Sequence, residues 1–306
     1  MIVVRLMGGL GNQMFQYAFG KMLAIKNGTE LKLDLSLLKG NSDIEHYVKR
    51  SFDLDIFDLK VEFATESEIA HFNGYTNASF LKKIYHKLNR VLKRRNLWIQ
   101  NNHQFNRKHL KLSNNICIVG RWQSYKYFES VTNEIRRDFM VNSHFLTESI
   151  YTKLILTNNT KAVAVHVRRG DYVSNPYYSR TIGALNVDYY VKAYEYATKS
   201  IKGAIFYVFS EDIEWCQKHL DFIVNANFVL TDRSKKGMAN DFNLITKCHN
   251  HIISNSTFSW WGAWLSENSK GMVIAPTRWA KESSFVPPEI YPVHWIKINN
   301  SFEEVN

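Results

Sequence analysis

A short valine-rich run, Ala162–Val167, is followed at once by Arg168, Arg169, Gly170 and Asp171. A nearly continuous apolar run of this length is typical of a buried strand. In open α/β sheets, ligands bind at the carboxyl ends of the strands, and a guanidinium group presents a planar fork of donors that matches phosphate oxygens. The stretch therefore predicts an α/β fold with an anion site. The alternative is that both arginines are surface charges paired with Asp171.

Strands and helices alternate in both halves of the chain, which predicts mostly parallel sheets. Expected strands cover residues 2–6, 31–35, 116–119, 162–167, 205–209, 227–230, 251–254 and 272–274. Expected helices cover residues 12–26, 125–139, 187–200, 212–220, 238–248 and 258–266. A polar break at residues 157–160 predicts a domain boundary after residue 158. We therefore expect two α/β domains, 1–158 and 159–306, with a cleft between them and the last residues packing back on the first domain.

Composition narrows the classes of protein to which this chain can belong. Of its 306 residues, 45% are hydrophobic and 22% charged, which is ordinary for a folded chain. No apolar run reaches the roughly 18 residues that a membrane-spanning helix needs. The three cysteines are odd in number and far apart, which argues against a disulfide framework and predicts small buried side chains. We expect a cytoplasmic protein.

The formal net charge of +11 is concentrated in one segment. Residues 81–95 contain seven lysines and arginines and no acidic residue, with apolar residues at helical spacing. This pattern predicts a basic amphipathic helix. It is either an ordinary helix with its lysines in water or a peripheral contact with an anionic membrane. Nucleic acid is not an expected partner, because no recognised nucleic-acid motif accompanies the charge.

Three further polar segments of the second half are predicted to lie near the arginine pair. Residues 210–212 follow a strand, Asp241 lies near the start of a helix, and residues 254–257 join a strand to a helix. Small hydroxyl and amide residues at a helix N-terminus either cap the helix or bind phosphate with help from the helix dipole. Together with two arginines, they predict an anion site built without a Walker lysine.

The first turn of the chain partly matches a dinucleotide fingerprint. Gly9 and Gly11 follow a strand and open a helix, and Asp34 lies farther along, but Met14 stands where the third glycine is expected. An NAD(P)-dependent oxidoreductase is therefore an alternative function. A non-catalytic basic protein that binds membranes or polyanions is a second alternative.

Two metal-like patterns are better explained by packing. Asp53 and Asp55 have the Asp-x-Asp spacing of many metal-dependent sugar-nucleotide enzymes, but they alternate with apolar residues. Along a strand, His249 and His251 would lie on one face and Cys248 on the other. No metal site is predicted.

The chain resembles the inverting α1,2-fucosyltransferases over nearly its whole length. The resemblance rests on four motifs in the family's order, at residues 8–13 (GGLGNQ), 166–172 (HVRRGDY), 209–212 (FSED) and 253–261 (ISNSTFSWW). It implies a GT-B-like fold of two Rossmann-like domains, with residues 1–158 on the acceptor side and residues 159–306 binding GDP-fucose. The implied reaction is transfer of fucose from GDP-β-L-fucose to the 2-hydroxyl of a terminal β-galactoside, such as lactose or N-acetyllactosamine. It also implies that no metal or other cofactor is required. The expected process is completion of a bacterial surface glycan, such as an O-antigen, or of its lipid-linked precursor.

The resemblance also implies roles for individual residues. Arg168 is expected to contact the β-phosphate, where its charge offsets that of the departing diphosphate in place of a metal. Asp241 is expected to read the guanine N1 and N2 donors, and Asn12 to close onto the donor. The full set of implied donor-binding residues is Asn12, His166, Arg168, Arg169, Asp241, Asn255, Ser256 and Thr257.

The catalytic base and the acceptor site are less well marked. Some related fucosyltransferases place a glutamate shortly after the arginine pair, but residues 172–177 contain no carboxylate. Asp171 is the nearest candidate for the base, with the orientation of Arg168 or Arg169 as its alternative role. Gln13 and Trp122 are the candidate acceptor-binding residues.

Overall fold

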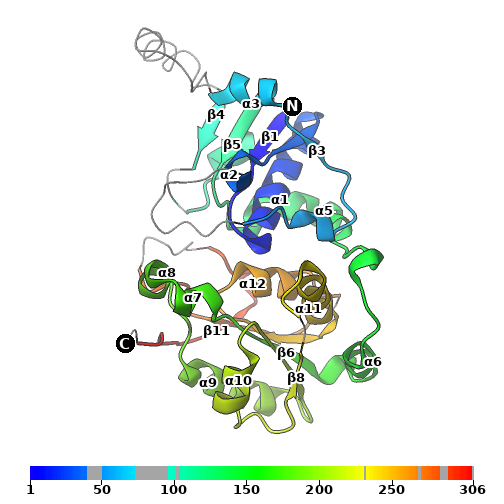
Figure 1. Ribbon diagram of the computed structural model, residues 1–306, viewed down its shortest axis with the longest axis vertical. Coiled ribbons are helices and arrows are strands. Elements are labelled where there is room, and N and C mark those ends of the chain that lie inside the picture. The colour runs from blue at the N-terminus through cyan, green and yellow to red at the C-terminus, as the bar shows by residue number, and fades with distance from the viewer. Residues whose placement is uncertain are drawn as a thin grey trace. The chain divides into compact units, whose positions relative to one another are not determined.

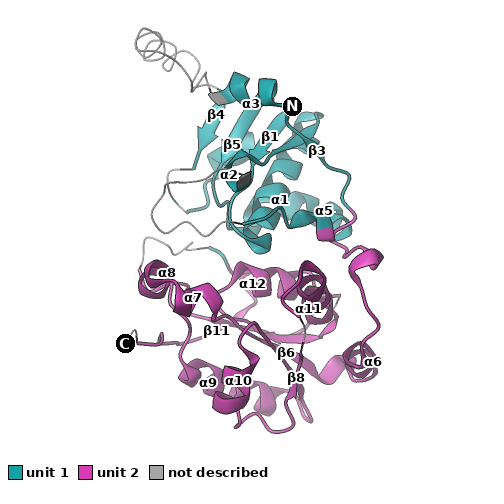
Figure 2. Cartoon of the chain, viewed as in Figure 1, with its two compact units in different colours: residues 1–55, 59–138, 287–290 teal, residues 56–58, 139–286, 291–306 magenta. Residues whose placement is uncertain are grey.

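The computed structural model describes residues 1–39, 50–73, 96–100, 102, 104–230, 232–267, 270–282 and 289–304. The chain divides into two compact units (Figure 2). Unit 1 comprises residues 1–55, 59–138 and 287–290, and unit 2 comprises residues 56–58, 139–286 and 291–306. Each unit is an α/β structure built on a parallel sheet, which confirms the predicted fold class. The cleft between the two domains stays a prediction.

The sheet of unit 1 has the strand order β3-β2-β1-β5-β4, with every neighbouring pair parallel. Its strands are β1 (Ile2–Arg5), β2 (Leu31–Asp34), β3 (Glu62–Phe63), β4 (Leu97–Ile99) and β5 (Ile116–Val119). The three central strands agree with the expected ones, whereas the two edge strands, β3 and β4, were not expected from the sequence.

Within the described part of unit 1, the helices are α1 (Leu10–Asn27), α2 (Ser36–Lys39), α3 (Glu66–Asn73) and α5 (Thr132–Asp138). Short 3₁₀ turns occupy Leu54–Ile56, Arg107–Lys111, Tyr125–Tyr127 and Glu129–Val131, so much of the helix expected at 125–139 is not α-helical. Helix α1 ends at Gly28, whose φ of 57° is left-handed. A Cβ on Gly20 would overlap Val4. Glycine at this position therefore lets α1 pack directly against β1 (Figure 1).

The sheet of unit 2 has the order β11-β10-β9-β6-β7-β8 and is also parallel throughout. Its strands are β6 (Ala162–Val167), β7 (Ile205–Ser210), β8 (Asn227–Phe228), β9 (Asn250–Ile252), β10 (Val273–Pro276) and β11 (Ile296–Ile298). Strand β11 was not expected from the sequence. It completes the sheet of unit 2, whereas the last residues were expected to pack back on the first domain.

Helices cover both faces of the sheet in unit 2. They are α6 (Ile150–Thr157), α7 (Gly170–Ser174), α8 (Pro176–Thr181), α9 (Val187–Ser200), α10 (Ile213–His219), α11 (Lys235–Lys247) and α12 (Thr257–Trp264). Val163 and Val165 of β6 pack in a core with α9 and α10, and Ala164 packs in a second core with α6 and α11. The continuous apolar run of β6 reflects burial on both faces.

The border between the units lies earlier than the boundary expected after residue 158. Phe139 already belongs to unit 2, where its ring lies 5.1 Å from that of Trp261. Ile155 of α6 is fully buried in unit 2. The polar stretch at 157–160 is therefore a tight turn between α6 and β6, in which Asn158 O accepts a hydrogen bond from Lys161 N–H at 2.8 Å.

The three cysteines, Cys117, Cys216 and Cys248, are buried free thiols, as expected. Among the described residues, no helix is both long and apolar enough to cross a bilayer. The basic segment 81–95 lies outside the described residues, so its contact with membranes stays a prediction.

Candidate functional site

Three of the predicted polar segments lie at one edge of the sheet in unit 2. Strands β7 and β9 are the two neighbours of β6, and all three are parallel. Their carboxyl ends therefore lie at the same edge, from which residues 168–171, 210–212 and 254–257 project. In register, Val167 at the end of β6 pairs with Ser210 at the end of β7.

Arg168 lies at this edge, where three neighbouring side chains orient its guanidinium group. Its Nη2 donates to Asp171 Oδ1 at 2.6 Å, and its Nη1 lies 3.3 Å from Glu211 Oε1. Its guanidinium carbon is 5.3 Å from the centroid of the Tyr172 ring. Burial alone lowers the pKa of Arg168, but Glu211 and Asp171 raise it above its ordinary value. The side chain is nevertheless 26% exposed. It is a permanently charged fork that an incoming ligand can reach.

Arg169 is held very differently. Its Nε donates to Asp212 Oδ2 at 2.9 Å, and its Nη1 donates to Glu303. The guanidinium carbon lies 4.0 Å from the centroid of the Trp215 ring, and only 10% of the side chain is exposed. Two carboxylates and an aromatic face therefore surround Arg169, whereas the resemblance implied a donor contact for it.

Gly170 makes the turn between the arginines and α7 possible. Its φ is +23°, and a Cβ at this position would lie 2.6 Å from Glu211 Oε1. That oxygen also accepts the backbone N–H of Arg169 at 2.9 Å. The absence of a side chain at Gly170 thus lets one carboxylate bind the backbone of the turn and the head group of Arg168.

His166 lies on β6, two residues before Arg168. It is only 6% exposed, and its Nδ1 is 2.9 Å from Ser254 Oγ at the end of β9. Burial, with a smaller contribution from the Arg168 charge, lowers the pKa of His166 to about 3. The imidazole is therefore neutral near pH 7 and acts as a hydrogen-bonding group rather than as a cation.

Residues 255–257 join β9 to α12. Asn255 is fully buried, and its Nδ2 donates to Gly183 O and Trp279 O, both at 3.0 Å. Ser256 caps α12, because its Oγ accepts the backbone N–H of residue 258 at 3.3 Å. Thr257 is the first residue of α12 and is partly exposed. Asn255 thus fastens two loops, and Thr257 is the most accessible of the three.

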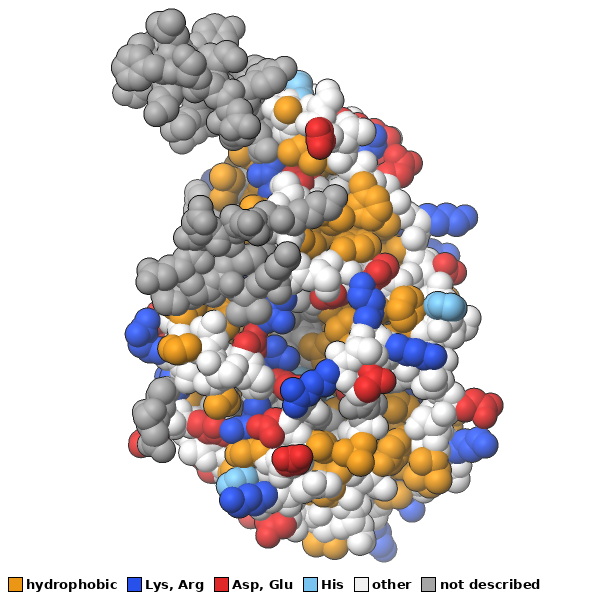
Figure 3. Space-filling model, viewed as in Figure 1, with side chains coloured by type: hydrophobic (Ala, Val, Ile, Leu, Met, Phe, Trp, Pro, Cys, Tyr) orange, Lys and Arg blue, Asp and Glu red, His pale blue; other side chains and the backbone are white. Residues whose placement is uncertain are grey.

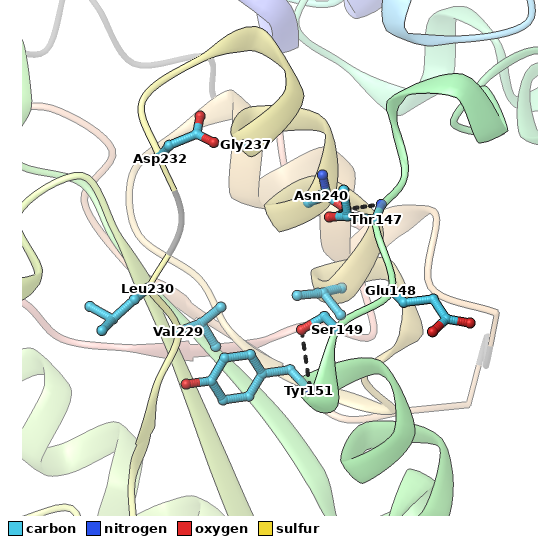
Figure 4. A pocket seen from close by; sticks show the side chains of 10 residues that line it. Thr147, Glu148, Ser149, Tyr151, Val229, Leu230, Asp232, Gly237 and Asn240 are labelled. Atoms are coloured by element: carbon cyan, nitrogen blue, oxygen red, sulfur yellow. Dashed lines mark hydrogen bonds between the residues drawn. The ribbon is translucent and has the colours of Figure 1, made fainter.

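Asp241 lies half-buried on α11. The same helix lines a cavity of about 230 Å³ (Figure 4), whose other lining residues are Thr147, Glu148, Ser149, Tyr151, Val229, Leu230 and Asp232. Gly237 and Asn240 line this cavity and Asp241 does not. One wall is fixed by Asn240, whose Oδ1 accepts the backbone N–H of Thr147 at 2.9 Å. Asp241 is thus placed on another side of α11.

In unit 1, the turn after β1 meets the loop after the neighbouring strand β5. Asn12 Oδ1 accepts a hydrogen bond from Gln123 Nε2 at 2.6 Å. Gly8 has a φ of +77°, and a Cβ there would lie 2.5 Å from Asn12 Nδ2. Gln123 was not singled out from the sequence. Its position just after β5, next in the sheet to β1, becomes evident only once the strand order is known.

Gln13 and Trp122 differ from the expectation of acceptor-facing side chains. Gln13 is fully buried, and its Nε2 donates to Gly8 O and Ser51 O, both at 2.8 Å. Its Oε1 accepts the backbone N–H of Asp53 at 3.0 Å. Trp122 is also fully buried, and its ring lies edge-on to His109 with 5.2 Å between centroids. Gln13 fastens the loop at 51–53, and Trp122 belongs to the core of unit 1.

The dinucleotide alternative fits the structure poorly. Asp34 would have to bind a ribose, but it is fully buried and its Oδ2 pairs with Arg5 Nε at 2.5 Å. Met14 fills the core beside β1. Among the described residues, no group of three or more His, Cys, Asp or Glu side chains is placed to hold a metal ion.

The face that Figure 3 displays gives no support to the polyanion-binding alternative either. Figure 3 shows Lys and Arg side chains interspersed with Asp and Glu side chains over the described residues of the face that it displays. A surface of mixed sign creates little long-range attraction for a polyanion.

Comparison with known proteins identifies the family. The family model described as glycosyl transferase family 11 matches residues 1–299. An α-1,2-colitosyltransferase of Escherichia coli is 31% identical over 97% of this chain and 98% of its own length. The O-antigen biosynthesis glycosyltransferase WbnK of Escherichia coli is 33% identical over 90% and 93%. A galactoside α-(1,2)-fucosyltransferase 1 of Mico humeralifer is 28% identical over 62% of this chain and 53% of its own length.

A solved structure extends the match to the fold. The NodZ α-1,6-fucosyltransferase, co-crystallised with GDP, covers 87% of this chain and 92% of its own with a TM-score of 0.50 at 13% identity. This likeness supports the fold alone, and the fold is GT-B-like, as the resemblance implied. The match over nearly the whole chain confirms the resemblance found in the four motifs: the chain is a glycosyltransferase and belongs to glycosyl transferase family 11.

Proposed function

We propose that the chain transfers L-fucose from GDP-β-L-fucose to the 2-hydroxyl of a terminal β-galactoside, with inversion at the anomeric carbon. The observation that carries this proposal is the Arg168 fork, 26% exposed and oriented by Asp171 and Glu211 at the carboxyl edge of β6. The α-1,2 linkage in the names of two relatives supports the choice of hydroxyl.

In this reaction, the acceptor oxygen forms a bond to C1 of fucose as the bond from C1 to the β-phosphate oxygen breaks. The electron pair of the broken bond stays on the diphosphate, and the acceptor hydroxyl passes its proton to solvent water. Arg168 stabilises the charge that develops on the leaving oxygen. The proposed chemistry therefore requires no metal ion.

The contacts of Asp171 favour an orienting role over that of catalytic base. Its Oδ1 accepts a 2.6 Å hydrogen bond from Arg168, and only 15% of its side chain is exposed. This placement suits a group that orients Arg168 better than one that meets an acceptor hydroxyl. We propose that Asp171 aims Arg168 at the diphosphate. If departure of the leaving group runs ahead of attack, a strong base is unnecessary.

A second candidate donor follows from the relatives. The α-1,2-colitosyltransferase matches 97% of this chain, farther than the galactoside fucosyltransferase does. Colitose is fucose without its 3-hydroxyl group, so both donors present the same diphosphate to Arg168. The nucleotide-binding residues cannot distinguish them, and the choice depends on the pocket around C3 of the sugar.

The test is an assay of the purified full-length protein with GDP-fucose or GDP-colitose as donor and lactose as acceptor, in EDTA. We expect an α1,2-fucosylated product and binding of GDP, measured by calorimetry. If only the colitosylated product forms, the proposed donor becomes GDP-colitose and the proposed reaction class is unchanged. Binding of NAD without binding of GDP would overturn the proposal, as would the absence of product from any β-galactoside.

A variant of Asp241 tests how the base of the nucleotide is read. Asp241→Asn replaces one acceptor oxygen by a donor, which opposes the N1 and N2 donors of guanine. We expect GDP affinity to fall by about tenfold to a hundredfold, while ADP affinity changes little. Calorimetry with both nucleotides measures this ratio. An unchanged preference for guanine would remove Asp241 from the site.

A further inference from the structure

A C-terminal segment runs along the surface of unit 2 and reaches the arginine cluster. Residues 301–304, here called the C-terminal strap, pair with the segment before α9 through an antiparallel bridge between Leu185 and Phe302. Glu303 N–H donates to Ala184 O at 2.9 Å, and Lys281 Nζ donates to Glu303 O at 2.7 Å. The backbone of Glu303 is therefore fixed on two sides.

The side chain of Glu303 ends at Arg169. It accepts a hydrogen bond from Arg169 Nη1 and forms an ion pair in which the two side chains are 25% and 10% exposed. The other carboxylate partner of Arg169 is Asp212, whose Oδ1 also caps α10 by accepting Trp215 N–H at 3.3 Å. Asp212 is thus held in place by a helix and Glu303 by the strap, and Arg169 is clamped between them.

We propose that Glu303 is a positioning residue of the donor site, which acts through Arg169 to fix the direction of Arg168. The two arginines are adjacent, and the turn that carries them is held at the backbone by Glu211 and at the side chain of Arg169 by this clamp. This inference rests on the proposed function, because it assigns the donor diphosphate to Arg168.

The charges of the cluster allow an electrostatic role of Glu303 to be distinguished from a positioning role, because the two roles change GDP affinity in opposite directions. Two arginines face four carboxylates: Asp171, Glu211, Asp212 and Glu303. Lys281 and Arg233 add two positive charges beside the cluster, where they donate to Glu303 O and Glu211 O. The carboxylates thus offset the cations, so attraction by net charge does not explain the binding of an anionic diphosphate. On electrostatic grounds alone, removal of Glu303 strengthens the binding of GDP. Loss of the clamp weakens it, because Arg169 then leaves its place and the turn at Arg168 loses a support.

The experiment compares four full-length proteins by calorimetry with GDP: wild type, Glu303→Ala, Glu303→Gln and Ser301→Ala. Glutamine retains an oxygen that accepts from Arg169 but loses the charge, whereas alanine loses both. Ser301→Ala is the matched control. It removes a hydrogen bond of 2.9 Å from Ser301 Oγ to Asp188 in the same strap and leaves Arg169 untouched.

We expect Glu303→Ala to weaken GDP binding by about tenfold or more, since small displacements at a preorganised site have effects of this size. Glu303→Gln should restore part of the affinity, and Ser301→Ala should bind GDP like wild type. In steady-state kinetics, Glu303→Ala should raise the KM for the donor and leave that for the acceptor unchanged. Melting temperatures of all four proteins show whether each variant is folded at the assay temperature.

Three results would overturn the proposal. Tighter GDP binding by Glu303→Ala would mean that Glu303 acts through its charge. Unchanged GDP affinity in Glu303→Ala would mean that the strap only stabilises the fold. Equal weakening of GDP binding in Ser301→Ala and Glu303→Ala would mean the same. A wild-type protein that fails to bind GDP overturns the proposed function instead, so the two failures are distinguishable.

Discussion

The carboxyl edges of the two sheets carry different chemistry. In unit 2 the edge carries charges, with Arg168 paired to Asp171 and Glu211. In unit 1 the corresponding edge has a largely buried ion pair, Arg5 with Asp34, and beyond it two amides, with Asn12 bonded to Gln123. Charged groups suit a diphosphate, whereas amides suit the hydroxyl groups of a neutral sugar. Similar frameworks thus present different chemistry, so the ligand class follows from the residues at the strand ends rather than from the fold.

The largest effect is expected from a substitution that removes the charge of Arg168 from the edge of unit 2. Arg168→Ala should lower kcat/KM by about a thousandfold or more, because a preorganised group that stabilises the leaving diphosphate is lost. The kcat/KM of Arg168→Lys should lie between that of wild type and that of Arg168→Ala, since a lysine keeps the charge but not the planar fork. Initial rates with GDP-fucose and lactose measure both.

The matched control for Arg168 is Arg180→Ala, which removes an exposed arginine from α8. It should leave both the rate and the melting temperature near their wild-type values. If Arg168→Ala is as active as Arg180→Ala, the charged edge is not the site, and the comparison between the two units fails.

The next largest effect tests whether Gln13 in unit 1 stabilises the fold rather than binding the acceptor. Gln13→Ala leaves Gly8 O, Ser51 O and the Asp53 N–H without their present partner. We expect a loss of about 2–5 kcal/mol in the free energy of unfolding, with GDP affinity unchanged in the folded protein. Urea unfolding and calorimetry measure the two quantities.

Gln104 offers a control of the same residue type, because its side chain is exposed in unit 1. Gln104→Ala should change the unfolding free energy by less than about 0.5 kcal/mol. A Gln13→Ala protein with wild-type stability and an increased KM for lactose would instead return Gln13 to the acceptor site.

The smallest expected effect concerns pH and sharpens the description of the charged edge. Burial lowers the pKa of His166 from 6.5 to about 3 in the folded protein, so the unfolded chain binds the proton more readily. Stability from this group is complete above pH 6.5 and falls as the pH decreases toward 3. Within that window, one proton contributes a slope of about 1.4 kcal/mol per pH unit.

His166→Gln keeps a hydrogen-bonding group but cannot take up the proton. Its unfolding free energy should therefore decrease less steeply between pH 6 and 4 than that of wild type. His251, whose pKa is also lowered by burial, to about 4, stays in both proteins and cancels in the comparison. Equal pH slopes would show that His166 binds a proton as readily in the folded protein as in the unfolded chain, which would make it a third cation at this edge below about pH 6.5.

The central strands were predictable because burial on both faces leaves an apolar run in the sequence. The strands that escaped prediction are β3, β4 and β11, and each lies at the edge of its sheet. They are two or three residues long and have intermediate or exposed side chains. Strands this short and this exposed leave no apolar run, and only pairing with a neighbour defines them.

The site was predictable to the extent that its contacts are local. Arg168 and Asp171 are three residues apart, so their ion pair was foreseen as an alternative. The separate role of Arg169 was not, because its partner Glu303 is 134 positions away in the sequence. Burial of Gln13 depends likewise on Ser51 and Asp53, which reach it only through the fold.

The position of β6 in its sheet also bears on the order in which unit 2 folds. Val163 pairs with Phe206 of β7, which is the next strand along the chain, and with Asn250 of β9, which follows two strands later. Closing the shorter loop costs less chain entropy, so we expect the β6–α9–β7 unit to form first. The turn bearing Arg168 then meets Glu211 while α12 is still unformed, and Ser254 joins His166 in a later step.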